Sequence, residues 1–270
     1  MKATKWKSYS LALIAGMSVL TACSSDDNND NGGNGNNGNG NEIENGTTLK
    51  GTITSDVTLT AGSTYKLSGE YIVEDGATLN IEAGVKIISI YDDIVDYILV
   101  KQGGKINAVG TSSAPIVMTS EKEEPGAWGG IHICGKAHTN AEGGKGSSEI
   151  GGATYGGNDD ADNSGTLKYV RVEYSGYAFD SEHEANGITF YGVGNGTTVE
   201  YCQAYKGSDD GFEFFGGSVN VSNLVAVSCS DDSFDWTEGW NGKGTNLVAY
   251  QEDKSTLGYD CDCLMECDNN

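Results

Sequence analysis

The sequence predicts an all-β protein, a single-stranded parallel β-helix whose coils take about 22 residues each. The first observation is a repeat, because residues 199–214 align with residues 221–236 at a constant offset of 22 without a gap. Self-similarity at a fixed period of this size is typical of solenoids. The second observation is that short stretches of alternating apolar and polar residues are separated by Gly, Asn and Asp, with no helical period. Leucine-rich repeats share the period, but their leucine spine is missing.

The N-terminus indicates an export signal. A flank with three Lys residues precedes an apolar run from Leu11 to Ala22, which is too short to span a bilayer. The junction Leu20-Thr21-Ala22-Cys23 resembles the signal of bacterial lipoproteins, in which cleavage precedes a Cys that carries lipid. We therefore expect residues 1–22 to be a lipoprotein signal peptide and Cys23 to be the lipidation site. The lipid would be the only contact with the membrane.

Residues 23–45 should form a disordered tether. From Asn28 onward this segment consists almost wholly of Asn, Gly and Asp. Such residues bury too little apolar surface to offset the entropy lost on ordering. The acidic start at Ser24–Asp27 resembles the surface-export signal of Bacteroidota lipoproteins. We therefore expect a lipid-anchored protein of the outer membrane that faces the cell exterior.

The β-helix should occupy residues 46–270. Equivalent positions of successive coils should stack inward at the strand spacing of a sheet, about 4.8 Å. We expect such stacks for Phe212 with Phe234 and for Cys202 with Leu224. The Gly- and Asp-rich stretch 136–164 interrupts the repeat and should loop out. The chain ends one turn after a repeat without a polar cap, and because solenoids need capped ends we expect a C-terminal truncation.

Four segments in combination resemble a known family. They are residues 76–84 (GATLNIEAG), 114–120 (APIVMTS), 128–131 (WGGI) and 164–172 (SGTLKYVRV). The combination is similar to a family of Bacteroidota surface lipoproteins, and the resemblance covers most of residues 47–260. It implies a right-handed parallel β-helix at the cell surface. That family is functionally uncharacterised, so the resemblance implies no reaction.

Stacked carboxylates form the strongest candidate site. They recur one coil apart, at Asp209, Asp210, Glu213, Asp231, Asp232 and Asp235. Like charges at the coil spacing repel by about 1–3.5 kcal/mol, so either solvent exposure or a hard cation such as Ca²⁺ must compensate. Asp residues are common in turns and no Ca²⁺-loop spacing is matched. The pattern therefore favours an exposed acidic turn over a metal site.

The same carboxylates could serve a polysaccharide-degrading enzyme, in which one acid protonates the leaving oxygen and another activates water. The segment Gly207–Asp210 resembles the Gly-Asp-Asp element of polygalacturonases, but the Gly-His-Gly and Arg-Ile-Lys motifs of that family are missing. A lyase needs a basic side chain, and Arg171 is the single arginine. We assign no catalytic residue, and the sequence argues against an enzyme.

Outward aromatic residues are candidates for ligand binding. They are Tyr191, Tyr205, Phe215 and Tyr250. Such rings could stack on sugars, or an insertion or a partner could cover them. Valines at positions 225, 227 and 248 also point outward, which favours a covered face.

Cysteine and histidine give weaker signals. A cluster near the end contains Cys261, Cys263 and Cys267. A disulfide between the first two would join the same side of one strand, which is an awkward geometry, and a metal site lacks a fourth ligand. His132 and Cys134 alternate with two isoleucines, so both should point outward. The sequence assigns no role to these residues.

Charge completes the prediction. The chain has 39 acidic and 16 basic residues, and its net charge of −23 repels nucleic acid and anionic lipid. We predict a monomeric, non-enzymatic cell-surface lipoprotein that presents a β-helical face to glycans or surface proteins. Ca²⁺ is the one candidate cofactor. The alternatives are a polysaccharide-degrading enzyme, either a glycoside hydrolase or a lyase, and a Ca²⁺-stabilised structural spacer.

Overall fold

The computed structural model describes residues 41–92, 94–180 and 183–268. The expected signal peptide, the lipidation site Cys23 and residues 23–40 of the expected tether lie outside the described residues. The expected tether boundary at residue 45 is wrong, because β1 (Asn41–Ile43) already pairs in parallel with β3 (Val57–Leu59). In the described part of the chain, no helix is long and apolar enough to cross a membrane.

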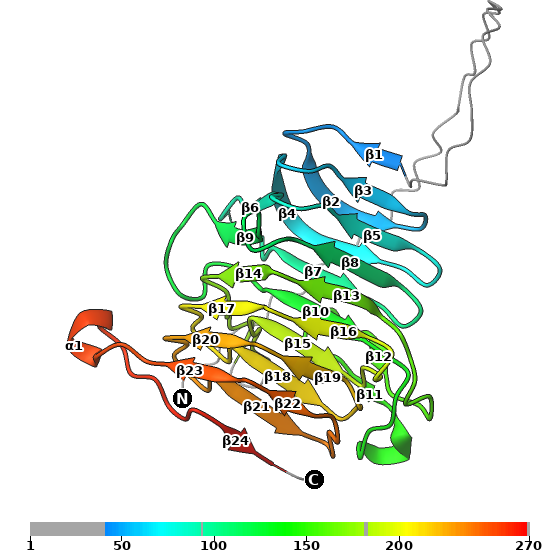
Figure 1. The fold of residues 1–270 in the computed structure, drawn as a ribbon, viewed down its shortest axis with the longest axis vertical. Helices are drawn as coiled ribbons and strands as arrows, with labels where there is room; N and C mark the ends of the chain where they lie inside the picture. Colours follow the sequence, from blue (N-terminus) through cyan, green and yellow to red (C-terminus); the bar gives the residue numbers. More distant parts are fainter. Residues whose placement is uncertain (1–40, 93, 181–182, 269–270) are drawn as a thin grey trace, which may run out of the picture. The chain divides into compact units, whose positions relative to one another are not determined.

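The described chain winds into a right-handed parallel β-helix, which confirms the predicted fold class (Figure 1). Face one is an eight-stranded parallel sheet. After β1 and β3 its strands are β5 (Thr78–Ile81), β8 (Lys105–Val109), β13 (Gly165–Lys168), β16 (Thr198–Glu200), β19 (Asn220–Ser222) and β22 (Gly244–Thr245).

Faces two and three are continuous because two strands run from one to the other. In β4 (Thr64–Val73), residues 64–67 pair with β6 on face two, whereas residues 70–73 pair with β7 on face three. The strand β2 (Thr48–Ile53) pairs along both parts of β4. Face two continues with β6 (Lys86–Ser89), β9 (Ile116–Ser120), β14 (Val170–Glu173), β17 (Gln203–Tyr205), β20 (Val225–Val227) and β23 (Val248–Tyr250). Face three continues with β7 (Tyr97–Val100), β10 (Ile131–Cys134), β15 (Ile188–Tyr191), β18 (Phe212–Phe215), β21 (Phe234–Thr237) and β24 (Glu266–Cys267).

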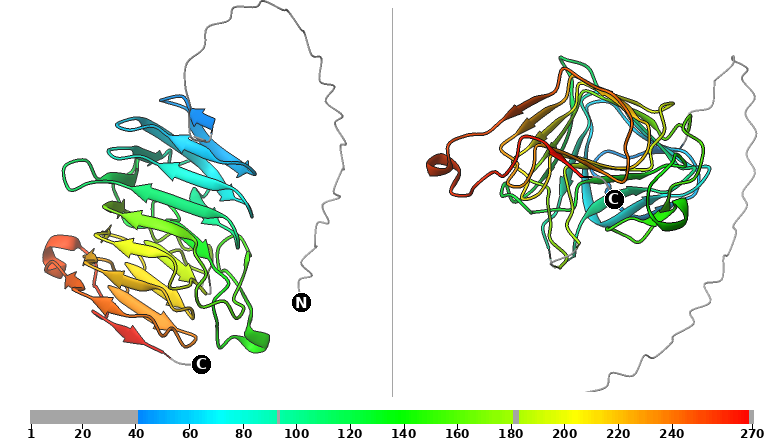
Figure 2. Two further views of the ribbon diagram at one scale, coloured as in Figure 1. Left: turned by 45° about the vertical axis from the view of Figure 1, so that its right-hand side comes forward. Right: turned by 90° about the horizontal axis from the view of Figure 1, so that it is seen from below.

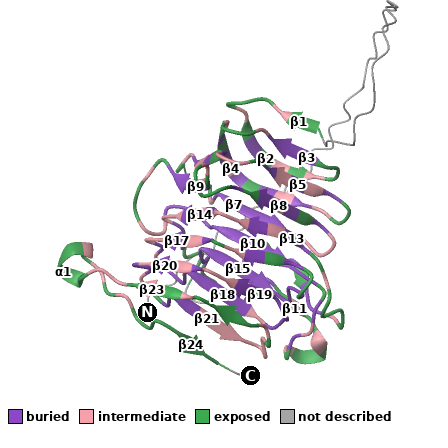
Figure 3. Ribbon diagram, viewed as in Figure 1, coloured by how far each residue is buried: buried purple, intermediate pink, exposed green. Residues whose placement is uncertain are grey.

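The coils lie directly over one another (Figure 2), and their interior is one apolar core. The rings of Phe212 and Phe234 stack with centroids 5.5 Å apart, and Cys202 is a buried core residue, so both inward predictions are confirmed. The purple strand positions of Figure 3 show this burial along all three faces. A single-turn helix, α1 (Lys254–Leu257), interrupts the last coil; the Asp253 side chain caps its start.

A sharp corner joins face one to face two in the later coils. One residue makes each corner, and it has a positive φ of 51–57° at Tyr169, Tyr201, Asn223 and Asn246. The left-handed region is costly for residues other than Gly and Asn. Stacking across coils accompanies it, since the rings of the two tyrosines lie 4.7 Å apart and the Asn246 amide donates to Asn223 Oδ1 at 3.1 Å.

The stretch 136–164 does not loop out into solvent as expected. Its elements are η1 (Glu142–Gly144), β11 (Gly146–Ser147) and β12 (Thr154–Tyr155). Its apolar side chains join outward residues of face three in a second buried cluster, made of Tyr97, Leu99, Cys134, Ile150, Ala153, Tyr155, Ala185 and Tyr191. His132 and Cys134 therefore point away from the main core, as predicted, but both are fully buried.

Candidate functional site

One outward row of face three positions the candidate site. The strand register aligns Ile72, Leu99, His132, Thr189, Glu213, Asp235 and Glu266 in successive coils. In a β-strand every second side chain points to the same face, so all seven project outward from the core. The row begins with two apolar side chains, continues with His132 and Thr189, and ends with three consecutive carboxylates.

The carboxylate end of this row opens into an acidic cavity of about 210 Å³. We define the acidic cavity by its nine lining residues, of which eight are carboxylates and none is Lys, Arg or His: Glu149, Glu184, Asn186, Asp209, Asp210, Glu213, Asp231, Asp235 and Glu266. The strands β18, β21 and β24 supply one carboxylate each, and the turns before β18 and β21 supply three aspartates. The stretch 136–164 supplies Glu149.

Burial contradicts the favoured interpretation of an exposed acidic turn. The exposed fractions of Asp209, Asp210 and Glu213 are only 8%, 7% and 9%. Of the predicted metal-ligand candidates, Asp231 is exposed and Asp235 is half-buried. Asp232 is buried but does not line the acidic cavity; its Oδ1 instead accepts from the backbone N–H of Cys263 at 2.7 Å.

Few donors satisfy these buried oxygens. Asn186 Nδ2 donates to Glu213 Oε2 and, at 3.2 Å, to Thr189 Oγ1. The N–H of Asp232 donates to Asp210 Oδ1 at 2.9 Å. By contrast, Asp235 Oδ1 is buried and has no hydrogen-bond partner among the described residues. An orphaned carboxylate oxygen is costly in a protein interior unless a cation completes the site.

The pKa values of the lining carboxyl groups show that the acidic cavity lacks positive charge. Burial, and then the charges of neighbouring carboxylates, raises the pKa of Asp209 to about 8. The same two causes raise the pKa values of Asp210 and Glu213 well above their ordinary range. Burial also raises the pKa of Glu149 to about 7, although Tyr191 Oη donates to it at 3.3 Å. Without a cation, the acidic cavity therefore holds protons near neutral pH.

The carboxylates come close enough to share one ion. Oxygens of Asp210, Glu213 and Asp235 all lie within 4.8 Å of one another, and a second such group joins Asp209, Asp210 and Asp231. Ca²⁺ takes six to eight oxygen ligands at about 2.3–2.6 Å, so two ligands of one ion are separated by at most about twice that distance. An oxygen-only donor set around buried negative charge fits a hard divalent cation.

The four predicted aromatic ligand residues do not form one surface. Tyr191 is fully buried beneath the stretch 136–164, which removes it from the residues that could stack on a sugar. Phe215 is half-buried and stacks on Tyr191 with centroids 4.7 Å apart. Tyr205 and Tyr250 lie on face two; Arg171 covers the Tyr205 ring at 4.5 Å, and Tyr250 is 58% exposed.

The terminal cysteines are not part of the acidic cavity. Cys261, Cys263 and Cys267 are all free thiols. The carboxylates of Asp232 and Asp262 lie beside Cys263 and raise the pKa of its thiol to about 11, which suppresses the reactive thiolate.

Sequence reasoning missed four lining residues of the acidic cavity. Glu149, Glu184 and Asn186 lie in segments that interrupt the repeat, so the period gave no signal for them. Glu266 continues the row of Glu213 and Asp235, but its offset from Asp235 is 31 residues rather than 22. A search that allowed an insertion of nine residues in the last coil could have found it.

Comparison with known proteins identifies the fold family. The family model described as a pectate-lyase like beta helix domain matches residues 51–270. The chain belongs to this family. No curated protein and no solved structure matches the chain. Membership in the pectate-lyase like beta helix family establishes the solenoid architecture that carries the acidic cavity, and it is compatible both with binding and with polysaccharide degradation.

Proposed function

We propose that this protein is a non-enzymatic binding protein of the cell surface whose acidic cavity holds Ca²⁺. The observation that carries the proposal is the convergence of Asp210, Glu213 and Asp235 within 4.8 Å, with no basic side chain among the residues that line the acidic cavity. The cation would remove the repulsion and supply a partner to the orphaned Asp235 Oδ1. Asp231, Glu184 and Glu266 at the exposed rim leave one side of the ion open to oxygens of a glycan or of a partner protein.

The charge distribution favours binding over lyase chemistry. A lyase needs a side chain beside the substrate that acts as the base, or a positively charged side chain that neutralises the charge of the substrate. Arg171 lies on face two, where it pairs with Glu173 and covers Tyr205, so it does not reach the acidic cavity.

Calorimetry and thermal unfolding test the cation site. Adding CaCl₂ to EDTA-treated full-length protein should give a saturable heat change and raise the melting temperature, with a stabilisation of about 2.7 kcal/mol at a hundred times the Kd. Glu213→Gln keeps the size of the side chain and removes one ligand charge, so it should abolish most of this shift. Glu42→Gln in β1 is the matched control and should behave as wild type, since Glu42 is exposed and lies on face one. A wild-type curve that is indifferent to both Ca²⁺ and EDTA would refute the cation site.

The location is part of the proposal. The sequence around Cys23 supports a lipid anchor at the outer membrane, on the exterior face. Cys23→Ser should shift the protein from the membrane fraction to the soluble fraction, and surface proteolysis of intact cells should remove the wild type. Unchanged membrane association of Cys23→Ser would contradict the anchor.

One observation favours a second candidate, a glycoside hydrolase. The acidic cavity contains carboxyl groups whose pKa values lie near neutrality, about 8 for Asp209 and about 7 for Glu149. One such group can keep a proton while another is ionised, which is the pairing that hydrolysis needs. Release of reducing sugar from polygalacturonate or a neutral glycan, abolished in Asp209→Asn, would establish this alternative; no release by the wild type rejects it.

A further inference from the structure

We infer that face one carries a separate binding surface for an uncharged polysaccharide that runs along the axis of the coils. The inference does not depend on the acidic cavity, which lies on face three. Its basis is an outward row of small polar side chains, which the register aligns as Thr58, Asn80, Asn107, Thr166 and Thr198. Thr58 is buried at the floor of this row, and the other four are half-buried or exposed. We call these five residues the polar row. Adjacent members are one strand spacing apart, about 4.8 Å.

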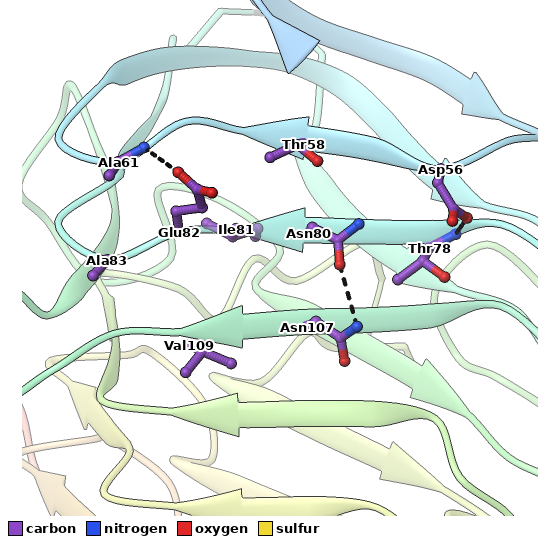
Figure 4. A pocket seen from close by; sticks show the side chains of 10 residues that line it. All are labelled: Asp56, Thr58, Ala61, Thr78, Asn80, Ile81, Glu82, Ala83, Asn107 and Val109. Atoms are coloured by element: carbon purple, nitrogen blue, oxygen red, sulfur yellow. Dashed lines mark hydrogen bonds between the residues drawn. The ribbon is translucent and has the colours of Figure 1, made fainter. Parts of the chain in front are cut away.

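The first part of the polar row is recessed. A hollow of about 650 Å³ lies over Thr58, Asn80 and Asn107 (Figure 4). Two carboxylates border it and are tied to backbone: Asp56 Oδ1 accepts from the N–H of Thr78 at 2.9 Å, and Glu82 Oε2 accepts from the N–H of Ala61 at 2.8 Å. These bonds fix the turns at the two ends of the strands, so the hollow is formed before any ligand arrives.

The two amides of the polar row keep unused hydrogen-bonding capacity. Asn107 Nδ2 donates to Asn80 Oδ1 at 3.2 Å, and Asn80 Nδ2 makes a long contact of 3.4 Å with the carbonyl of Val57. Each amide has two N–H donors and a carbonyl with two lone pairs. Among the described residues nothing donates to Asn107 Oδ1, which leaves an acceptor and N–H donors side by side. Sugar hydroxyls both donate and accept, so they match this mixture.

An aromatic platform adjoins the polar row. Tyr169 and Tyr201 stack with an interplanar angle of 12° at the corner directly after β13 and β16, and Tyr201 is 42% exposed. The neighbouring charges cancel, because Lys168 pairs with Glu200 at 2.6 Å. An exposed ring beside amides and hydroxyls is the combination that recognises the apolar face and the polar edge of a pyranose.

The charges around the polar row favour an uncharged ligand. The five residues of the polar row carry no charge, whereas three carboxylates border them: Glu42, which is in register beyond Thr58, and Asp56 and Glu82 beside the hollow. These carboxylates would repel uronates, and the whole chain carries −23.

Four apolar residues line the hollow, Ala61, Ile81, Ala83 and Val109, but Val109 is the one large exposed side chain among them, at 44% exposure, and Ile81 is fully buried. A protein partner would find little there for an apolar interface core. A donor–acceptor pattern that recurs once per coil is suited to a ligand that is itself a repeating polymer.

Affinity electrophoresis and calorimetry on the full chain in EDTA test the inference, with soluble mannan, xyloglucan and mixed-linkage glucan as uncharged probes and polygalacturonate as the acidic probe. At least one uncharged polymer should bind, and polygalacturonate should not. Tyr201→Asn and Asn107→Ala should each weaken binding by about tenfold, the loss of one good contact. Asn suits the corner because Asn223 occupies the equivalent position one coil on, with a φ of 56°.

The control is Gln203→Ala, which removes an outward amide from face two and should leave binding unchanged. Three results would overturn the inference: no uncharged polymer binds, the two face-one variants bind like wild type, or binding in EDTA is lost in Glu213→Gln. The last result would assign the glycan to the acidic cavity. Failure of Ca²⁺ binding, by contrast, would leave the inference on face one intact.

Discussion

The two halves of the outward row on face three have the same backbone geometry, but the first half stabilises the fold whereas the second half contains charges that repel one another. In the first half, Leu99 is fully buried beneath the stretch 136–164, and His132 is fully buried beside the rings of Tyr97 and Tyr191. In the second half, Glu213 and Asp235 face other carboxylates across the coil spacing. A β-helix repeats any side chain at about 4.8 Å, which accumulates contacts for apolar residues and repulsion for charged ones. A row of like residues therefore adds up either favourable contacts or electrostatic repulsion over several coils.

The difference also shows what each half needs to be stable. The apolar half is completed within the chain, because Ile150, Ala153 and Tyr155 cover it. Among the described residues, no basic side chain lines the acidic half. Its unpaired Asp235 Oδ1 and the raised pKa values of its carboxyl groups show that protons or a cation must neutralise it. A row of charges that the described side chains do not neutralise does not stabilise the fold, so it is a candidate for ligand binding.

The largest expected effect comes from the apolar half. Leu99→Ala would leave a cavity between face three and Gly151 and should lower the free energy of unfolding by about 2–5 kcal/mol. Urea unfolding measures the change. Val248→Ala is the matched control: its side chain is 51% exposed on face two, so we expect a change within about 0.5 kcal/mol. A loss of less than about 1 kcal/mol in Leu99→Ala would show that the stretch 136–164 does not seal the row.

The next effect concerns pH and the acidic half. Because the pKa of Asp209 is raised to about 8 from an ordinary value near 4, the folded protein holds a proton there that the unfolded chain has already released. Without divalent cations, stability should therefore fall as pH rises from about 4 to 8, by about 1.4 kcal/mol per pH unit for each such group. Unfolding in EDTA across this range measures the slope. Glu213→Gln should flatten it, and a slope that Ca²⁺ leaves unchanged would contradict cation binding by these carboxylates.

His132 in the apolar half should have the opposite dependence. Burial lowers the pKa of His132 to about 4, below its ordinary value near 6.5, although Gly129 O accepts from its ring at 2.6 Å. Its contribution to stability is present above pH 6.5 and is lost as pH falls toward 4. His132→Gln keeps a donor for Gly129 O and should remove this acid-side loss, measured by unfolding at pH 4 and pH 7. An unchanged acid-side loss in the variant would show that His132 does not titrate in this way.

The sequence predicted the regular part of the fold well. The offset of 22 between residues 199–214 and 221–236 reappears as the pairing of β18 with β21, including Phe212 over Phe234. In a parallel β-helix, equivalent positions of successive coils have similar surroundings, so the length of a coil appears in the sequence as a period of similar residues. The row of Glu213 and Asp235 was predictable for the same reason.

The parts that the sequence misjudged depend on segments without a period. Glu213 looked exposed because its strand alternates, yet the stretch 136–164 and the segment before β15 bring Glu149 and Asn186 against it. For Tyr191 the sequence left two alternatives, a ligand-binding ring or a ring covered by an insertion, and the structure shows the covered one, because Tyr191 is fully buried beneath the stretch 136–164. Alternation shows which side of a strand a residue faces, but it does not show what a distant insertion places on that side.

The smallest expected effect concerns how the stretch 136–164 is held. Tyr155 Oη donates to the Glu238 carboxylate at 3.0 and 3.1 Å, and Thr139 Oγ1 also donates to it. Tyr155→Phe keeps the ring in the second buried cluster and removes one donor, so we expect a loss of about 0.5–1.5 kcal/mol. Tyr250→Phe is the control, because that ring is 58% exposed and should cost nothing measurable.

Hydrogen exchange distinguishes a local from a global role for this bond. If Glu238 holds the stretch 136–164 against face three, Tyr155→Phe should speed exchange of backbone amides in β12 and leave those of β5 on face one unchanged. Because Glu149 reaches the acidic cavity from the same stretch, the variant should also weaken Ca²⁺ binding slightly. Equal acceleration of exchange in β5 and β12 would mean that the bond stabilises the whole β-helix, and that the two halves of the row do not respond separately.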